Sequence, residues 1–186
     1  MAYFNNEQLE NMGFKYVGKD VKISDKASIY DPDKISIGDY SRIDDFCIVS
    51  GKVNIGKFVH ITPMCLIAGG EPGVELSDFS TLAYGVKIFS QTDDYSGETM
   101  VNSLIDPCFK KEIFAPVKIS KHVIVGSNAV VFPGVTIEEG CSIGSMTLVH
   151  KTTKPWGIYV GIPSRRLKER KKDLLELESR FLKSIK

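Results

Sequence analysis

The stretch GVTIEEGCSIGSMTLVHK, residues 134–151, decides the fold, because its aliphatic residues Ile137, Ile143 and Val149 are six positions apart. An α-helix has 3.6 residues per turn and would place residues six apart on different parts of its surface. The spacing therefore excludes an amphipathic helix here and indicates a repeating unit of six residues.

Each unit also carries a small or β-branched residue two positions before the large aliphatic one, as Cys141 precedes Ile143. Residues i and i−2 lie on the same side of a strand, so each unit is predicted to be a short strand with one large and one small inward side chain. Cys47, Cys65 and Cys141 occupy the small position and are predicted to be core residues. Cys108 lies outside the repeat.

The six-residue spacing extends in both directions from this stretch. The large aliphatic positions are Ile37, Ile43, Val49, Ile55, Ile61, Ile67, Leu76, Leu82, Ile88, Ile119, Val125, Val131, Ile137, Ile143 and Val149. Three units make one triangular coil of 18 residues, and such coils stack into a β-helical solenoid. Two interruptions occur, a short one at Gly69–Gly73 and a long one at residues 89–116.

Composition excludes several classes of protein. The 186 residues include 24 Lys and Arg against 23 Asp and Glu, a formal charge of +1, which gives no reason to expect nucleic acid as a partner. No apolar run is long enough to span a bilayer, and the N-terminus lacks the pattern of a secretory signal. With four cysteines and no CxxC pair, the expected location is the cytoplasm.

The block APVKISKHVIVGSNAVVFPGVTIEEGCSIGSMTLVHKTTKPWGIYVGIPSRRLKER (Ala115–Arg170) resembles the C-terminal signature of the sugar acetyltransferases in the hexapeptide-repeat acyltransferase family. The resemblance covers roughly Val21 to Arg166. It implies an all-β fold, a left-handed parallel β-helix, with acetyl-CoA as co-substrate and a homotrimer whose active sites lie between subunits.

Three regions are expected. Residues 1–20 form an N-terminal cap, with Asn5 or Asn6 capping a short helix. Residues 21–163 form the β-helix with an inserted loop at 89–116. Residues 164–186 contain no proline or glycine and are predicted to form a C-terminal amphipathic helix. The apolar face of that helix would carry Leu167, Leu174, Leu177 and Phe181.

The first catalytic candidate is His60, in IGKFVHITP. It precedes the inward Ile61, so its side chain points outward. The 18-residue coil, with the short insertion counted, stacks Arg42 and Thr81 beside it as candidate substrate-binding residues. The motif is similar to G-x-x-x-H-I of the family's amino-sugar N-acetyltransferases, in which the histidine lies near the acetyl group. It would serve as a base or orient the acetyl carbonyl, and the alternative is an ordinary surface or interface histidine.

The long interruption supplies the other catalytic candidates, Asp93 and Asp94, with Gln91 and Tyr95 as candidate sugar contacts. Long insertions in compact domains are more often functional than idle, although a solvated loop is the alternative. The loop lacks the catalytic histidine of the family's maltose- and galactoside-type O-acetyltransferases. A hydroxyl needs a positioned base, whereas a sugar amine with a pKa of roughly 8 is partly neutral already, so the sequence favours an amine acceptor.

The resemblance also implies the cofactor contacts. The pantetheine partners are expected at Gly126, Ser127, Asn128, Ala129, Gly144 and Ser145. The basic residues Lys151, Arg165 and Arg166 suit the phosphates of CoA, with solubilising charge as the alternative. No metal is expected, because His60, His122 and His150 lack the spacing of a three-histidine zinc site.

The sequence thus predicts transfer of acetyl from acetyl-CoA to the amino group of a nucleotide-linked amino sugar. A role in surface polysaccharide biosynthesis is implied by the resemblance alone. Two alternatives remain, a sugar O-acetyltransferase and a non-catalytic β-helical binding or assembly module.

Overall fold

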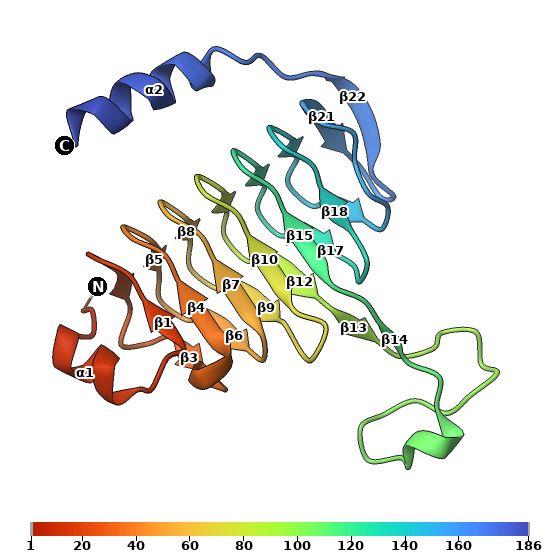
Figure 1. Cartoon of the computed structure of the whole chain (residues 1–186). Helices are drawn as coiled ribbons and strands as arrows, with labels where there is room; N and C mark the ends of the chain where they lie inside the picture. Colours follow the sequence, from red (N-terminus) through yellow and green to blue (C-terminus); the bar gives the residue numbers. More distant parts are fainter. Residues whose placement is uncertain (1, 186) are drawn as a thin grey trace.

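Turns at regular intervals wind the chain into a left-handed parallel β-helix of about 7 turns (Figure 1). The computed structural model describes residues 2–185. Strands in successive coils pair in parallel, as Arg42–Ile43 does with His60–Ile61, so every coil presents its strands in the same register. The predicted fold class is confirmed.

The β-helix is a three-sided prism whose faces are built from the strands of successive coils, and the second face also gains the antiparallel strand β22 at its end. The first face contains β1 (Tyr16–Val17), β4 (Ile35–Ile37), β7 (Val53–Ile55), β10 (Val74–Leu76), β15 (Val117–Ile119) and β18 (Thr136–Ile137). The second contains β2 (Lys22–Ile23), β5 (Arg42–Ile43), β8 (His60–Ile61), β11 (Thr81–Leu82), β16 (Ile124–Val125), β19 (Ser142–Ile143), β21 (Gly157–Val160) and β22 (Arg165–Glu169). The third contains β3 (Ser28–Ile29), β6 (Ile48–Ser50), β9 (Leu66–Ala68), β12 (Lys87–Phe89), β17 (Val130–Val131) and β20 (Leu148–Val149).

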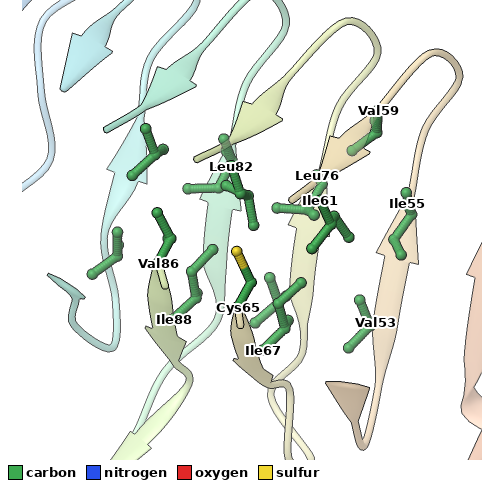
Figure 2. Packing of buried hydrophobic residues seen from close by; sticks show 14 of the residues in the cluster. Val53, Ile55, Val59, Ile61, Cys65, Ile67, Leu76, Leu82, Val86 and Ile88 are labelled. Atoms are coloured by element: carbon green, nitrogen blue, oxygen red, sulfur yellow. The ribbon is translucent and has the colours of Figure 1, made fainter. Parts of the chain in front are cut away.

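The core confirms the predicted repeat. Every large aliphatic position named above from Ile37 to Val149 is buried, and the small positions between them are buried as well. Figure 2 shows Cys65 pointing into the prism beside Ile61 and Ile67. The thiols of Cys47 and Cys141 each donate to a backbone carbonyl 3.1 Å away, so these cysteines are core residues as predicted.

The turns between the first and second faces carry an aromatic ladder that the six-residue pattern does not predict. Tyr40, Phe58, Phe79 and His122 all have a left-handed backbone, with φ between 55° and 61°. Their rings stack along the prism edge at centroid distances of 5.0, 4.9 and 5.4 Å. These non-glycine residues occupy a backbone region that ordinarily favours glycine, and their stacked rings offset part of that cost.

The N-terminal segment caps the first coil. Helix α1 (Asn6–Asn11) begins after Asn5, whose side chain accepts a hydrogen bond from the Gln8 backbone at 2.9 Å, and Leu9 is buried against the core. The predicted cap helix is therefore present. The expected boundary at residue 20 is too late, however, because β1 already pairs with β4 of the next coil.

The C-terminal segment corrects a second expectation. Residues 164–186 are not one helix: β22 (Arg165–Glu169) pairs antiparallel with β21, and helix α2 (Leu174–Ser184) begins only later. Pairing to β22 covers the hydrogen-bonding edge that β21 would otherwise expose at the end of the solenoid, which overrides local helix propensity. Leu167 consequently lies on an exposed strand and not on the helix.

Helix α2 folds back over the aromatic ladder. Phe181 contacts Phe58 and Phe79 edge-on, with centroids 5.4 and 6.4 Å away. Glu178 accepts from Lys121 at 2.6 Å and from His122 at 2.9 Å.

The two interruptions lie at turns between the third and first faces. Gly69–Gly73 joins β9 to β10. Residues 89–116 project from the prism as an antiparallel pair, β13 (Gln91–Thr92) and β14 (Ile113–Phe114), beyond which the loop extends outward (Figure 1). The loop also holds a short 3-10 helix at Pro107–Phe109, and another, Pro32–Lys34, precedes β4. Within residues 2–185 no helix is long and apolar enough to cross a membrane.

Candidate active site

The second face carries an outward row of side chains centred on His60. Parallel pairing aligns Arg42 with His60 and His60 with Thr81, so the three predicted neighbours are adjacent. The His60 side chain is 40% exposed. The row therefore presents an accessible imidazole between a guanidinium and a hydroxyl.

Asp44 links this row and was missed by the sequence reasoning. Its carboxylate, 3% exposed, accepts from Nε of Arg42 at 2.5 Å and from Nε2 of His60 at 2.9 Å. The hydrogen bond from Arg42 to Asp44 raises the pKa of Arg42. The sequence did contain one signal for Asp44, namely a charged residue at a position that is uncharged in the neighbouring coils. The residues directly after β2, β8 and β11 are Ser24, Thr62 and Ala83.

Two further groups adjoin the network. The ring of Tyr3 lies 5.6 Å from the Arg42 guanidinium, since the N-terminal segment bridges to Ser24 at the edge of the second face. The hydroxyl of Thr62 is buried and has no hydrogen-bond partner among the described residues. A buried hydroxyl without a partner is costly, so Thr62 weakens the packing beside Asp44.

In the projecting loop, Asp94 is held by its own neighbours. Its carboxylate accepts from the backbone and hydroxyl of Ser96 at 2.9 and 2.8 Å and from the hydroxyl of Thr99 at 3.0 Å. The hydrogen bonds from Ser96, followed by that from Thr99, lower the pKa of Asp94. Such a carboxylate stays ionised and suits an ammonium partner better than it suits the role of a base.

The other candidate residues of the loop have side chains that are fully or partly exposed to solvent. Asp93 is half-buried, Gln91 is exposed on β13 and Tyr95 is 88% exposed. Their side chains are therefore available to a sugar or to a neighbouring molecule.

The structure does not bring His60 and the loop together within one chain. His60 lies on the second face, whereas the loop leaves the prism between the third and first faces. The predicted catalytic residues thus form two separate groups in a single chain.

The predicted pantetheine residues do lie together. Residues 126–129 and 144–145 belong to successive turns between the second and third faces, and the amide of Met146 donates to the carbonyl of Ser127 at 2.8 Å. Gly126 packs so closely on the next turn that a Cβ there would lie 2.5 Å from the Ser145 nitrogen.

The predicted phosphate contacts are dispersed. Lys151 follows β20 and lies at the opposite edge of the third face from the pantetheine residues. Arg165 and Arg166 lie on β22, where Arg166 pairs with Glu169 at 2.6 Å. Among residues 2–185, no group of three or more His, Cys, Asp or Glu residues could hold a metal ion.

The β-helix of hexapeptide repeats is the fold of one class of proteins, the hexapeptide-repeat acyltransferases. No protein-family model matches the chain. It is 42% identical over 184 residues to the dTDP-4-amino-4,6-dideoxy-D-glucose acyltransferase of Escherichia coli, covering 97% of this chain and 95% of that protein. The chain belongs to the family of that acyltransferase, and it is an acyltransferase.

The comparison with solved structures also finds acyltransferases of this fold. The chain is 44% identical to AntD, an N-acyltransferase from Bacillus cereus in complex with dTDP and 3-hydroxybutyryl-CoA, with a TM-score of 0.97 over 98% of this chain and 97% of that one. A hexapeptide-repeat acetyltransferase from Vibrio cholerae, 17% identical with a TM-score of 0.57 over 88% of this chain and 75% of that one, shares the fold.

Proposed function

We propose that this protein transfers an acetyl group from acetyl-CoA to the amino group of a dTDP-linked 4-amino-4,6-dideoxy sugar. The observation that carries the proposal is the similarity to the E. coli acyltransferase along nearly the whole of both chains. AntD variants have also been solved with coenzyme A and dTDP-4-amino-4,6-dideoxyglucose. The role in surface polysaccharide and the location in the cytoplasm, which suits four free cysteines, belong to the same proposal.

The loop supports an amine over a hydroxyl acceptor. Its residues include no histidine, so a sugar hydroxyl would meet no imidazole base there. Asp94 remains anionic because its hydrogen bonds lower its pKa. A carboxylate has about four acceptor positions and three are filled by Ser96 and Thr99, which leaves room for one N–H of an ammonium group.

In this proposal Asp94 holds the sugar amine, Asp93 adds a second negative charge, and Gln91 and Tyr95 contact the sugar. The bound ammonium first loses one proton to solvent; the neutral amine then attacks the thioester carbonyl carbon, and the C–S bond breaks with its electron pair passing to sulfur. His60 takes up the amine proton or orients the carbonyl, beside Arg42 and Thr81. Holding the amine next to the thioester supplies much of the acceleration.

The donor would run along the turns between the second and third faces. The stacked amides of residues 126–129 and 144–145 line this edge and suit the pantetheine arm. Lys151, Arg165 and Arg166 would contact CoA phosphates from separate elements.

We propose that a second copy of the chain completes the active site and that the assembly is a homotrimer. A loop on one copy would reach the His60 row of its neighbour, joining the two groups that one chain keeps apart. The third face supports this assembly, because its outward residues include Ile48, Leu66, Val130 and Leu148. The corresponding positions in the central strands of the first face are polar or charged (Ser36, Asn54, Glu75 and Lys118), and they are unsuited to a dry interface. A monomer in sedimentation at micromolar concentration would contradict the trimer.

The test is release of CoA thiol and mass of the product with dTDP-4-amino-4,6-dideoxyglucose, compared with the matching 4-hydroxy sugar nucleotide. We expect turnover of the amino sugar only. Turnover of the hydroxyl sugar alone would establish the O-acetyltransferase, and absence of both turnover and acetyl-CoA binding would favour a binding module. 3-Hydroxybutyryl-CoA, bound by AntD, tests the choice of acyl group.

Asp94→Asn should raise KM for the amino sugar about 10-fold or more, because the ammonium loses a charged partner of about 1.5–3 kcal/mol. Glu98→Gln removes a charge from the same loop and is the matched control. An unchanged KM for Asp94→Asn would remove Asp94 from the amine site.

A further inference from the structure

Asp44 is a buried carboxylate on the second face, and burying a charge is costly unless it serves a purpose. The side chain is almost inaccessible, yet it carries a charge at a place where the other coils have uncharged residues. Its two oxygens are divided between two donors, Oδ1 to Arg42 and Oδ2 to His60. Buried charges persist where they are paired and hydrogen-bonded, and here one partner is the candidate catalytic histidine.

We propose that Asp44 is a positioning residue that holds His60 in the tautomer with its proton on Nε2 and leaves Nδ1 for the reactants. The catalytic consequence rests on the proposed function, because it takes His60 to act in acyl transfer. The tautomer itself does not depend on that function.

The assignment follows from the chemistry of the two groups. An ionised carboxylate only accepts hydrogen bonds, so the 2.9 Å contact from Nε2 to Asp44 requires a proton on Nε2. A neutral imidazole has one donor and one acceptor nitrogen, so Nδ1 then carries the lone pair. It is Nδ1 that can take the proton released when the sugar amine forms its bond to the acyl carbon and the C–S bond breaks. Once protonated, the same nitrogen can return that proton to the CoA sulfur.

Arg42 completes the arrangement by fixing the carboxylate. Its Nε lies 2.5 Å from Oδ1, which orients the other oxygen toward His60, and its permanent charge offsets that of Asp44. Tyr3 packs over the guanidinium and connects the N-terminal segment to the network.

The tautomer can be read directly by NMR on protein labelled with ¹⁵N-histidine. The chain has three histidines, so the spectrum is simple, and a His60→Asn variant identifies the His60 signals by their loss. At about pH 8.5 an ordinary imidazole is neutral, and its protonated and unprotonated nitrogens resonate far apart. We expect Nε2–H for His60 in the wild type and a shift toward Nδ1–H in Asp44→Asn, whose amide can donate to Nε2.

Kinetics on the same variant give the functional readout. We expect kcat of Asp44→Asn to fall about 100-fold, the lower range for general acid–base contributions, with KM for acetyl-CoA nearly unchanged. Asp45→Asn is the matched control, because it removes the same charge from the next residue, which bonds to Ser24. It should retain both the His60 tautomer and kcat.

Each outcome of these two experiments either supports or overturns the proposed role of Asp44. Nδ1–H in the wild type, or an unchanged tautomer in a folded Asp44→Asn, overturns the proposal, and the wild-type spectrum needs no variant to fold. A shifted tautomer with a lowered kcat supports it in full. A shifted tautomer with normal kcat in both Asp44→Asn and His60→Asn would confirm the positioning and instead reject the role that the proposed function gives to His60.

Discussion

Removing Phe79 from the centre of the aromatic ladder should be among the most destabilising changes at a turn. Its ring contacts Phe58 at 4.9 Å, His122 at 5.4 Å and Phe181 of helix α2 at 6.4 Å. Aromatic pairs contribute about 0.5–1.5 kcal/mol each beyond area burial, so Phe79→Ala removes three such terms, about 1.5–4.5 kcal/mol. The burial lost with this half-buried ring adds about 1 kcal/mol, for a total of about 2.5–5.5 kcal/mol.

Tyr40→Ala is the matched comparison. Tyr40 ends the ladder and, among residues 2–185, stacks only on Phe58, at 5.0 Å. Its φ is 60° against 59° for Phe79, so the backbone cost of a left-handed alanine cancels between the two variants. Its single stacking pair, about 0.5–1.5 kcal/mol, and about 1 kcal/mol of lost burial give an expected loss of about 1.5–2.5 kcal/mol. Urea unfolding followed by circular dichroism, at one fixed protein concentration, gives both free energies of unfolding. Equal losses for the two variants would refute the ladder as a cooperative element.

Three further predictions concern other parts of the chain. Burial of Glu178 opposes its ionisation, but hydrogen bonds from Lys121 and His122 outweigh this and lower its pKa below 4.5. Its ion pairs therefore stabilise the fold above that pH and are lost as the pH falls through the folded value, so Glu178→Gln should flatten an acid unfolding curve in this range. Gly126→Ala should lower stability by about 1–3 kcal/mol in thermal unfolding, because its Cβ would meet backbone atoms at 2.5 Å, whereas Gly144→Ala, whose Cβ would meet the Val160 side chain at 2.9 Å and backbone only at 3.5 Å, is the comparison and should cost less. Of the four thiols, only the exposed Cys108 should react in the native protein, and Asp106→Asn should speed its alkylation, since the hydrogen bond with Asp106 raises the pKa of that thiol.

The repeat was readable because the interior of the prism is uniform. Each coil places the same two inward positions against the same neighbours above and below, so Ile37, Ile61 or Ile137 could be assigned without knowing what lay elsewhere. The stacking of Arg42, His60 and Thr81 followed from the same 18-residue coil, and the structure confirms it.

The parts that sequence reasoning missed depend on contacts outside the repeat. Residues 165–169 have a helical pattern locally but form β22, because β21 presents an unpaired edge only after the prism has formed. The ladder from Tyr40 to His122 was overlooked because its spacing varies as interruptions lengthen the coils. Asp44 was overlooked because its importance depends on the hydrogen bonds of its two carboxylate oxygens, one with Arg42 and one with His60.

The sequence by itself therefore determined the β-helix, its register and the row around His60, since a periodic burial pattern has one consistent solution at every coil. Only the tertiary structure decided that Asp44 joins Arg42 to His60, that Asp94 is held by Ser96 and Thr99, and that the loop leaves a different edge from the histidine. The physical reason is that burial is imposed repeatedly by a common core, whereas hydrogen bonds and ion pairs depend on the direction of single side chains.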